Sequence, residues 1–184
     1  MYFAFVSGNP ALDLAATVGT RRSEPIDVLA TPADLERWVA RCDELPDHVT
    51  ADSGTFQSAL SLREALYHLA LDRVLGRPFG REDLRIVNAA ATGPLPAVEL
   101  GNAGLRMSGD LVAALSHIAR SGIALLADPH ARIKECGRAE CTRLYLDRSR
   151  GARRTWCGMD ECGNRVKAAA YRTRRRTAER PACS

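Results

Sequence analysis

The sequence predicts a mainly α-helical protein with a small β-hairpin, and three observations point to this fold class. Apolar residues recur at spacings of three and four in several segments before Pro129, which is the helical period. Two short alternating runs flank the turn sequence GNAG at residues 101–104, as in a β-hairpin. Four of the six cysteines lie together after Pro129 and precede an arginine-rich run. We therefore expect a helical N-terminal domain over residues 1–128 and a small module over residues 132–180.

Local signals place the individual elements. Thr31 suits the N-cap of a helix because its hydroxyl can accept a hydrogen bond from the first turn, and Pro32 suits the first helical position. Gly76 and Pro78 end the longest helix, and Ser108 is expected to cap the last helix of the domain. The helices are expected at residues 9–18, 31–42, 55–75, from 81 to about 90, and 108–126, with hairpin strands at 97–100 and 105–107.

The net charge of +4 is divided unequally along the chain. Residues 132–184 carry a net charge of +9, whereas residues 1–131 carry −5. A basic module on an acidic body is typical of a protein that meets a polyanion. All basic residues except Lys134 and Lys167 are arginines, which suit bidentate phosphate binding, although a GC-rich genome gives the same composition.

The apolar runs and the opening residues do not predict a membrane span or a secretory signal. No apolar run reaches the roughly 20 residues that a membrane span needs. The opening residues, MYFAFVSGNP, lack the basic start and the long apolar stretch of a secretory signal. We therefore expect a cytoplasmic protein with no membrane partner, in a compartment where thiols bind metal or stay reduced.

The clustered cysteines have the spacing C-x4-C-x15-C-x4-C, in two copies of CGxxEC. Two short-loop pairs can supply four soft ligands to one Zn²⁺ ion, and a set of four thiolates leaves no open position for catalysis. We therefore predict one structural zinc ion, with two disulfides or four unrelated thiols as the alternatives. Gly137 and Gly158 are expected to let each pair turn sharply. The predicted ligands are Cys136, Cys141, Cys157 and Cys162.

An arginine-rich loop lies between the two cysteine pairs. Leu144–Leu146 is expected to form a strand and Thr155–Trp156 its return, so that the loop between them presents its arginines to solvent. Asp147 is expected to hold a neighbouring arginine. Trp156 is expected to pack over the zinc site rather than to stack on bases, because large aromatic side chains seldom stay exposed.

A basic helix is predicted after the last ligand, from about Asn164, because this segment is rich in alanine and lacks proline until residue 181. At 100° per residue, Arg165, Arg172 and Arg176 fall on one stripe of this helix. Nucleic-acid phosphate is the natural partner of such a helix, and a solvated basic tail is the alternative. The candidate DNA-contacting residues are Arg148, Arg150, Arg153, Arg154, Arg165, Lys167, Arg172, Arg174, Arg175 and Arg176.

The C-terminal segment resembles the CGNR zinc finger, whose motif stands here at residues 162–165. The DRSR element at residues 147–150 and the arginine pair before Trp156 belong to the same pattern. The N-terminal part is similar to the ABATE-type domain that usually precedes this finger. Its LDLxNT-like opening corresponds to LDLAAT at residues 12–17, and its TPxDLxxW stretch to TPADLERW at residues 31–38.

The resemblance covers nearly the whole chain and implies a stress-linked transcription regulator. It also implies that the four-cysteine module is a treble-clef-like or ribbon-like zinc finger ending in the basic helix. One position departs from the pattern, because Ala16 stands where the opening motif usually has asparagine. If that asparagine serves a ligand pocket, the pocket of this protein is altered; if it only caps a turn, little changes.

The leading hypothesis is a zinc-dependent, DNA-binding transcription regulator whose N-terminal domain binds a small-molecule effector or forms a homodimer. A zinc-stapled module for protein or RNA, and a ligand-binding domain without DNA binding, are the alternatives. An enzyme is not expected, because the four histidines are scattered and no catalytic motif is present. His68, near Arg63 and Tyr67, is the strongest catalytic candidate. A polar pocket where Asp13 and an arginine converge would indicate ligand binding or catalysis.

Overall fold

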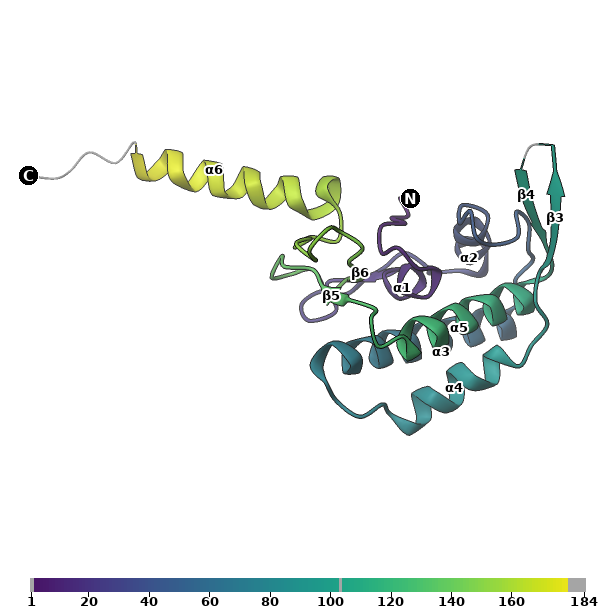
Figure 1. Ribbon diagram of the computed structural model, residues 1–184. Helices are drawn as coiled ribbons and strands as arrows, with labels where there is room; N and C mark the ends of the chain where they lie inside the picture. The colour runs from purple at the N-terminus through teal and green to yellow at the C-terminus, as the bar shows by residue number, and fades with distance from the viewer. Residues whose placement is uncertain (1, 103, 179–184) are drawn as a thin grey trace, which may run out of the picture.

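The computed structural model describes residues 2–102 and 104–178, and the expected end of the module at residue 180 lies outside them. It confirms a mainly helical chain with small antiparallel strand pairs and a four-cysteine cluster (Figure 1). The helices are α1 (Pro10–Ala15), α2 (Pro32–Val39), α3 (Ser53–Leu75), α4 (Arg81–Ala91), α5 (Leu111–Ala127), the π-helical turn η1 (Met159–Gly163) and α6 (Asn164–Ala178). The strands are β1 (Val18–Gly19), β2 (Ile26–Asp27), β3 (Ala97–Gly101), β4 (Gly104–Ser108), β5 (Ile133–Glu135) and β6 (Leu144–Leu146).

Side-chain caps fix where the helices of the body begin. Thr31 caps α2 as predicted, and Asp34 returns the hydrogen bond by accepting from the Thr31 N–H at 2.8 Å. The expected cap of α5, Ser108, is wrong: Ser108 pairs with Ala97 in the hairpin, and Asp110 accepts from the Ala113 N–H at 2.8 Å instead. Both residue types cap helices well, so strand pairing decides between them.

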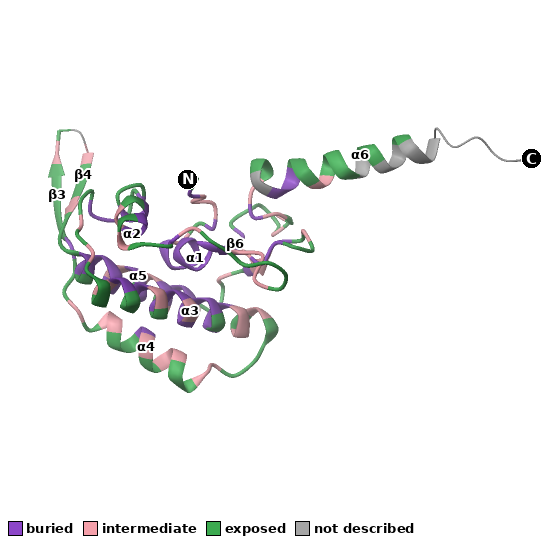
Figure 2. Cartoon of the chain, turned by 180° about the vertical axis from the view of Figure 1, so that it is seen from behind, coloured by how far each residue is buried: buried purple, intermediate pink, exposed green. Residues whose placement is uncertain are grey.

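The core lies where α1, α3 and α5 pack together, and their facing surfaces are buried (Figure 2). Gly122 on α5 is the point of closest approach. A Cβ atom there would lie 2.6 Å from Leu66 Cδ2 and 3.1 Å from Ala11 Cβ, so a larger residue would push the helices apart. Small residues at this crossing let the three helices share one core.

The β3–β4 hairpin stands away from the helices (Figure 1). Its register pairs Ala97 with Ser108 and Gly101 with Gly104, so each strand is slightly longer than predicted. The hairpin leaves Val98, Leu100 and Leu105 exposed, with Leu100 85% accessible to solvent. The short β1–β2 pair was not predicted from the sequence; its two-residue strands are too short to show an alternating pattern.

The C-terminal module is packed against the helical body. Ile133 of β5 and Leu144 of β6 form a buried cluster with Leu12, Tyr67 and Leu125 from α1, α3 and α5. The module is too small to build a sufficient core alone, and this shared cluster supplies apolar contacts it lacks. The two parts of the chain are therefore joined by a common core.

Helix α6 projects away from the body, and both overall views show it without another element along its length (Figures 1 and 2). The helix instead continues directly from η1, which holds Cys162, the last of the four clustered cysteines. Among the described residues, no helix combines the length and the apolar character needed to cross a membrane.

Candidate metal centre and nucleic-acid interface

Two structural units carry the four cysteines. Strands β5 and β6 are antiparallel, with Glu135 opposite Leu144, and Cys136 and Cys141 lie in the connection between them. Cys157 follows the arginine-rich loop, and Cys162 lies in η1 at the start of the basic helix. The ligand pairs therefore tie a strand connection to the base of α6.

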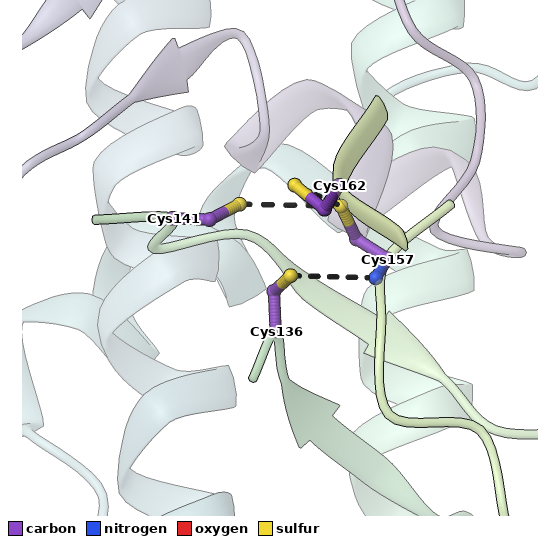
Figure 3. A group of neighbouring side chains, drawn as sticks. All are labelled: Cys136, Cys141, Cys157 and Cys162. Carbon is purple, nitrogen blue, oxygen red and sulfur yellow. Dashed lines mark hydrogen bonds between the residues drawn. The ribbon is translucent and has the colours of Figure 1, made fainter. Parts of the chain in front are cut away.

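The four sulfurs lie together as one metal site requires (Figure 3). All of them lie within 4.8 Å of one another. The Cys141 and Cys157 Sγ atoms are 3.9 Å apart, and those of Cys157 and Cys162 are 3.6 Å apart. A tetrahedral Zn²⁺ site with bonds of about 2.3 Å has sulfur–sulfur edges of about 3.8 Å. The spacing therefore fits one zinc ion and is too long for disulfide bonds.

The cluster is buried, and Cys157 is fully inaccessible to solvent. Hydrogen bonding to the sulfurs of Cys136 and Cys141, and then burial, raises the pKa of Cys157. Burial likewise raises the pKa of Cys162, whereas hydrogen bonds with Cys141 and Cys157 lower that of Cys136. A zinc ion stabilises the thiolates, so binding releases protons and weakens at acidic pH. The donor set, the burial and the spacing all fit structural zinc.

The glycines next to the cysteines serve a different purpose from the one expected. Gly158 has φ −168°, an extended conformation that any residue adopts. Gly137 allows close packing: a Cβ atom there would lie 2.8 Å from Thr155 Cγ2 and 3.1 Å from the Thr155 carbonyl oxygen. The Gly137 N–H donates to that carbonyl at 2.9 Å, which joins the two halves of the site.

The expected pairing of Leu144–Leu146 with Thr155–Trp156 is wrong. Strand β6 pairs with β5 instead, because this arrangement buries Leu144 against the helical body. Trp156 packs against the buried cysteine cluster, as predicted, and is half-buried there.

The loop after β6 is fixed by Asp147 and Lys134. Lys134 Nζ donates to Asp147 Oδ2 at 2.7 Å and also to the carbonyl of Ala152. Asp147 Oδ1 accepts from the Ser149 N–H at 2.9 Å and from its hydroxyl at 2.6 Å. These bonds, first the one from Lys134, hold the pKa of Asp147 well below its usual range. The prediction that Asp147 holds a neighbouring arginine is therefore corrected to a lysine and a serine.

The loop arginines divide into two groups. Arg148, Arg150 and Arg153 are exposed. Arg154 is turned inward: its Nε donates to the Trp156 carbonyl at 2.9 Å, one Nη donates to the carbonyls of Val6 and Cys157, and its guanidinium lies 4.5 Å from the centre of the Tyr145 ring. Arg154 thus ties the finger to the N-terminal segment, and its side chain is engaged there rather than available to a partner.

Helix α6 presents a basic surface without any acidic residue. Arg165, Lys167, Arg172 and Arg175 are exposed, whereas the side chains of Arg174 and Arg176 lie outside the described residues. The expected cap is corrected: the Asn164 side chain donates to Asp160 Oδ1 at 3.1 Å, and α6 continues from η1 instead of beginning at a cap. The sequence reading missed Tyr171, an aromatic residue that is 58% exposed on this helix.

A cavity of about 200 Å³ lies between the helical body and the zinc finger, and we call it the interdomain cavity. Asp13 and three arginines line it together, which is the combination expected of a ligand-binding or catalytic pocket. Six of its lining residues are Asp13, Ala16 and Trp38 from the body, and Arg138, Arg143 and Arg165 from the finger. Ala16, the position that departs from the opening motif, is thus one of the residues that line this cavity.

Asp13 is only 7% exposed and accepts a hydrogen bond from the Ser7 N–H at 2.9 Å. Burial raises its pKa from 3.8 to about 6. A raised carboxyl pKa favours the folded state below the unfolded pKa, and this stabilisation is lost as the pH rises through the folded pKa. Asp13 therefore destabilises the protein at neutral pH relative to acidic pH.

We expect Asp13→Asn to raise the free energy of unfolding by about 1–3 kcal/mol at pH 8, with a smaller difference from the wild type at pH 5. The amide is neutral and keeps an oxygen for the Ser7 N–H. Urea unfolding of both proteins at the two pH values measures this difference. The other ionisable groups contribute equally in both proteins, so their effects cancel. Asp43→Asn, at an exposed carboxylate, is the control. If the difference in the free energy of unfolding does not grow from pH 5 to pH 8, the raised pKa of Asp13 is contradicted.

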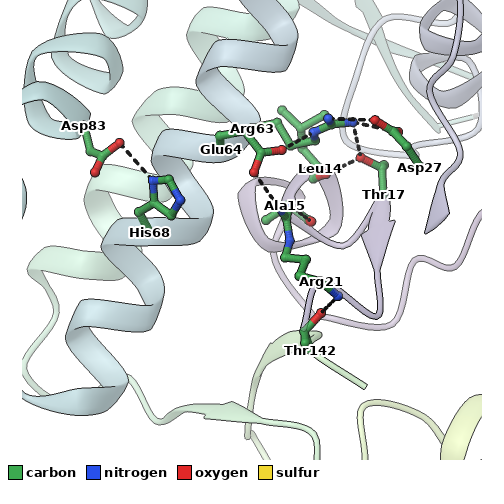
Figure 4. Close-up of polar contacts among 10 residues, drawn as sticks. All are labelled: Leu14, Ala15, Thr17, Arg21, Asp27, Arg63, Glu64, His68, Asp83 and Thr142. Atoms are coloured by element: carbon green, nitrogen blue, oxygen red, sulfur yellow. Dashed lines mark hydrogen bonds and ion pairs between the residues drawn. The ribbon is translucent and has the colours of Figure 1, made fainter. Parts of the chain in front are cut away.

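The histidine candidate has little support. His68 Nδ1 lies 3.3 Å from Asp83 Oδ1 at the surface, while Arg63 turns the other way to bind Asp27 at 2.8 Å (Figure 4). Arg63 also donates to Glu64, which pairs with Arg21. This network fastens the β1–β2 segment to α3 and is separate from the His68–Asp83 pair.

The network also reaches the zinc finger. The Arg21 N–H donates to Thr142 Oγ1 at 3.1 Å, and Arg22 pairs with Glu135 of β5 (Figure 4 shows the former). The Arg21 guanidinium lies 4.0 Å from the centre of the Tyr67 ring. These contacts hold residues 20–22 between the body and the finger.

The fold and the site together define a helical domain joined to a four-cysteine zinc finger. Comparison with family models gives the same division: residues 8–129 match ABATE, described as a putative stress-induced transcription regulator, and residues 132–175 match the CGNR zinc finger. The chain belongs to the ABATE family and carries a CGNR zinc finger. Comparison with curated proteins finds no match.

Proposed function

We propose that the protein is a cytoplasmic, zinc-dependent transcription regulator that binds DNA through its finger and acts in a stress response. The observation that carries this proposal is the placement of the basic residues. Arg165, Lys167 and Arg172 are exposed on a helix that projects from the body, and the zinc site fixes the base of this helix. The family description supports a regulatory role.

The dimensions of α6 support a groove contact. The helix has 15 residues and a length of about 22 Å, and the major groove of DNA, about 12 Å wide, admits an α-helix. Arg148, Arg150 and Arg153 are exposed on the fixed loop beside the finger core and can contact phosphates. We also propose Arg174, Arg175 and Arg176 as DNA contacts. Arg154 serves the finger's own structure.

Fluorescence anisotropy with duplex DNA over a range of salt concentrations tests the proposal. Seven described basic side chains are exposed on the loop and α6: Arg148, Arg150, Arg153, Arg165, Lys167, Arg172 and Arg175. If most contact phosphates, the logarithm of the affinity falls with the logarithm of salt concentration with a slope of about −4 to −6. Arg172→Ala should weaken binding and reduce the slope by about 1.

Arg81→Ala is the matched control, because Arg81 is exposed on α4 at the far side of the body from α6 (Figure 1). It should leave both the affinity and the slope unchanged. Absence of salt-dependent DNA binding by the zinc-loaded protein would reject the proposal. In that case a reproducible protein or RNA partner would favour the interaction-module alternative.

A homodimer is a further proposal. Its support is the exposed apolar surface of the projecting hairpin, where Val98, Leu100 and Leu105 lie together on paired strands. An isolated two-stranded hairpin is marginally stable in water, and a second copy would cover it. Dimeric regulators place two reading elements on DNA, which fits the proposed function.

A further inference from the structure

We propose that the interdomain cavity binds a small monocyclic aromatic carboxylate and that this ligand weakens DNA binding. The regulatory half of this inference rests on the proposed DNA-binding function, whereas the binding site does not. The cavity lies between residues of the helical domain and residues of the zinc finger, so an occupant touches both. Four features of its walls define the ligand and its effect.

The first feature is size. The cavity volume is about 200 Å³. An apolar cavity of about 150 Å³ accommodates benzene, so this one holds a single six-membered ring with one small substituent. A dinucleotide, a peptide or a long acyl chain is too large to be enclosed.

The second feature is an apolar wall from the helical domain. Phe3 and Trp38 are almost completely buried and line the cavity, with Val28 and the methyl group of Ala16 beside them. Aromatic and aliphatic side chains at this density favour a ring over a chain of polar groups. The methyl group of Ala16 also leaves room that an amide side chain would fill.

The third feature is a cationic wall from the finger. Arg138, Arg143 and Arg165 line the cavity opposite a single carboxyl group, that of Asp13. The buried Arg138 Nε has no hydrogen-bond partner within the described structure, and its guanidinium lies 4.0 Å from the exposed Glu140 carboxylate. Guanidinium groups bind carboxylates with two parallel hydrogen bonds. A ligand carboxylate would therefore face the arginines of the finger and avoid the Asp13 carboxyl group, with its ring against the apolar wall of the helical domain.

The fourth feature is shared use of Arg165. This residue lines the cavity and also belongs to the proposed DNA surface of α6. A carboxylate that engages Arg165 removes one positive charge from the surface that meets phosphate. Because coupling between two ligands is reciprocal, the carboxylate lowers the affinity for DNA by the same factor as DNA lowers the affinity for the carboxylate.

The cavity also depends on the metal site. Cys141 and Cys162 line it alongside the arginines, so the ion that holds these cysteines also holds the cationic wall. The binding site is therefore complete only in the zinc-loaded chain. Loss of ligand binding on zinc removal therefore distinguishes binding in the cavity from binding elsewhere on the helical domain.

Benzoate is the probe, and the zinc-loaded full chain is the protein. Isothermal titration calorimetry and intrinsic fluorescence, which reports on Trp38 in the cavity, measure binding without DNA. We expect saturable binding of benzoate, no binding of the neutral benzamide, and no benzoate binding after zinc removal. In DNA anisotropy, saturating benzoate should weaken binding by about fivefold or more and reduce the salt slope by about 1.

Two variants locate the effect. Ala16→Leu fills the apolar wall and should abolish benzoate binding while leaving DNA affinity unchanged. Arg165→Gln, at an exposed position, should make DNA binding insensitive to benzoate. Its DNA affinity should show the reduced salt slope even without benzoate. If Ala16→Leu disturbs the fold, which circular dichroism and thermal unfolding detect, Arg165→Gln alone decides the question.

The outcomes distinguish this inference from the proposed function. A protein that binds DNA but not benzoate overturns the binding site and leaves the proposed function standing. Benzoate binding with no change in DNA affinity overturns the regulatory coupling. Benzoate binding by a protein that never binds DNA supports the site and rejects the proposed function.

Discussion

Cys157→Ser is expected to abolish zinc binding and, with it, DNA binding. Cys157 is fully buried, and its sulfur lies 3.9 Å from that of Cys141 and 3.6 Å from that of Cys162. Free energies of structural zinc binding reach about 10–16 kcal/mol, which is far more than a small module's own core supplies. Without the ion the base of α6 loses its anchor, and the cationic surface is no longer held in one arrangement.

The measurements are the zinc content per chain and the DNA anisotropy titration of the purified variant. Cys42→Ser is the matched control, because Cys42 is also a buried thiol but lies in the core of the helical body. It should lower the stability moderately and keep one zinc ion and full DNA affinity. Retention of both zinc and DNA binding by Cys157→Ser would refute the ligand assignment.

Leu144→Ala is expected to reduce the free energy of unfolding of the whole protein by about 2–5 kcal/mol. Leu144 is 2% exposed and packs in the cluster that joins β5 and β6 to α1, α3 and α5. Its removal leaves a cavity between the finger and the body. Because the core is shared, both parts should unfold together in a single transition at lower denaturant concentration.

Urea unfolding followed by Trp fluorescence and by far-ultraviolet circular dichroism measures this effect. Leu95→Ala, at an exposed position ahead of the hairpin and outside its apolar surface, is the control and should change the free energy of unfolding by less than about 0.5 kcal/mol. Two separated transitions, of which Leu144→Ala shifts only one, would show that finger and body fold independently.

The parts of the fold that depend on local sequence could be predicted. Thr31 and Pro32 begin α2, and the left-handed Gly76 follows the end of α3, because caps depend on neighbouring residues alone. The four zinc ligands were also predictable, since their spacing reflects the reach of two short loops.

The features set by long-range contacts could not be predicted. The pairing of β6 with β5 depends on Leu12, Tyr67 and Leu125, which are distant in the sequence. Arg154 looks like its exposed neighbours in the sequence, and only the folded chain brings the carbonyl of Val6 to it. From the sequence, a pocket with Asp13 and an arginine could be named only as a condition for ligand binding or catalysis. The finger packs on the body so that Asp13 and Arg165 line one cavity, which meets this condition.

Lys134 is a sequence signal of a structural position. It is one of two lysines in an arginine-rich chain, and its single ammonium group fits a small, half-buried site where it binds Asp147 and two backbone carbonyls. A guanidinium is larger and planar, so arginine would not fit this arrangement equally well. A lysine in a chain whose other basic residues are nearly all arginine can therefore mark a structural position.

The dependence of DNA binding on zinc is tested most directly by titrating Zn²⁺ into the metal-free protein while the anisotropy of labelled DNA is recorded at constant salt. We expect DNA binding to be absent at the start, to rise with added zinc and to reach its plateau at one equivalent per chain. Full DNA binding before any zinc is added, or none at one equivalent, would contradict this expectation.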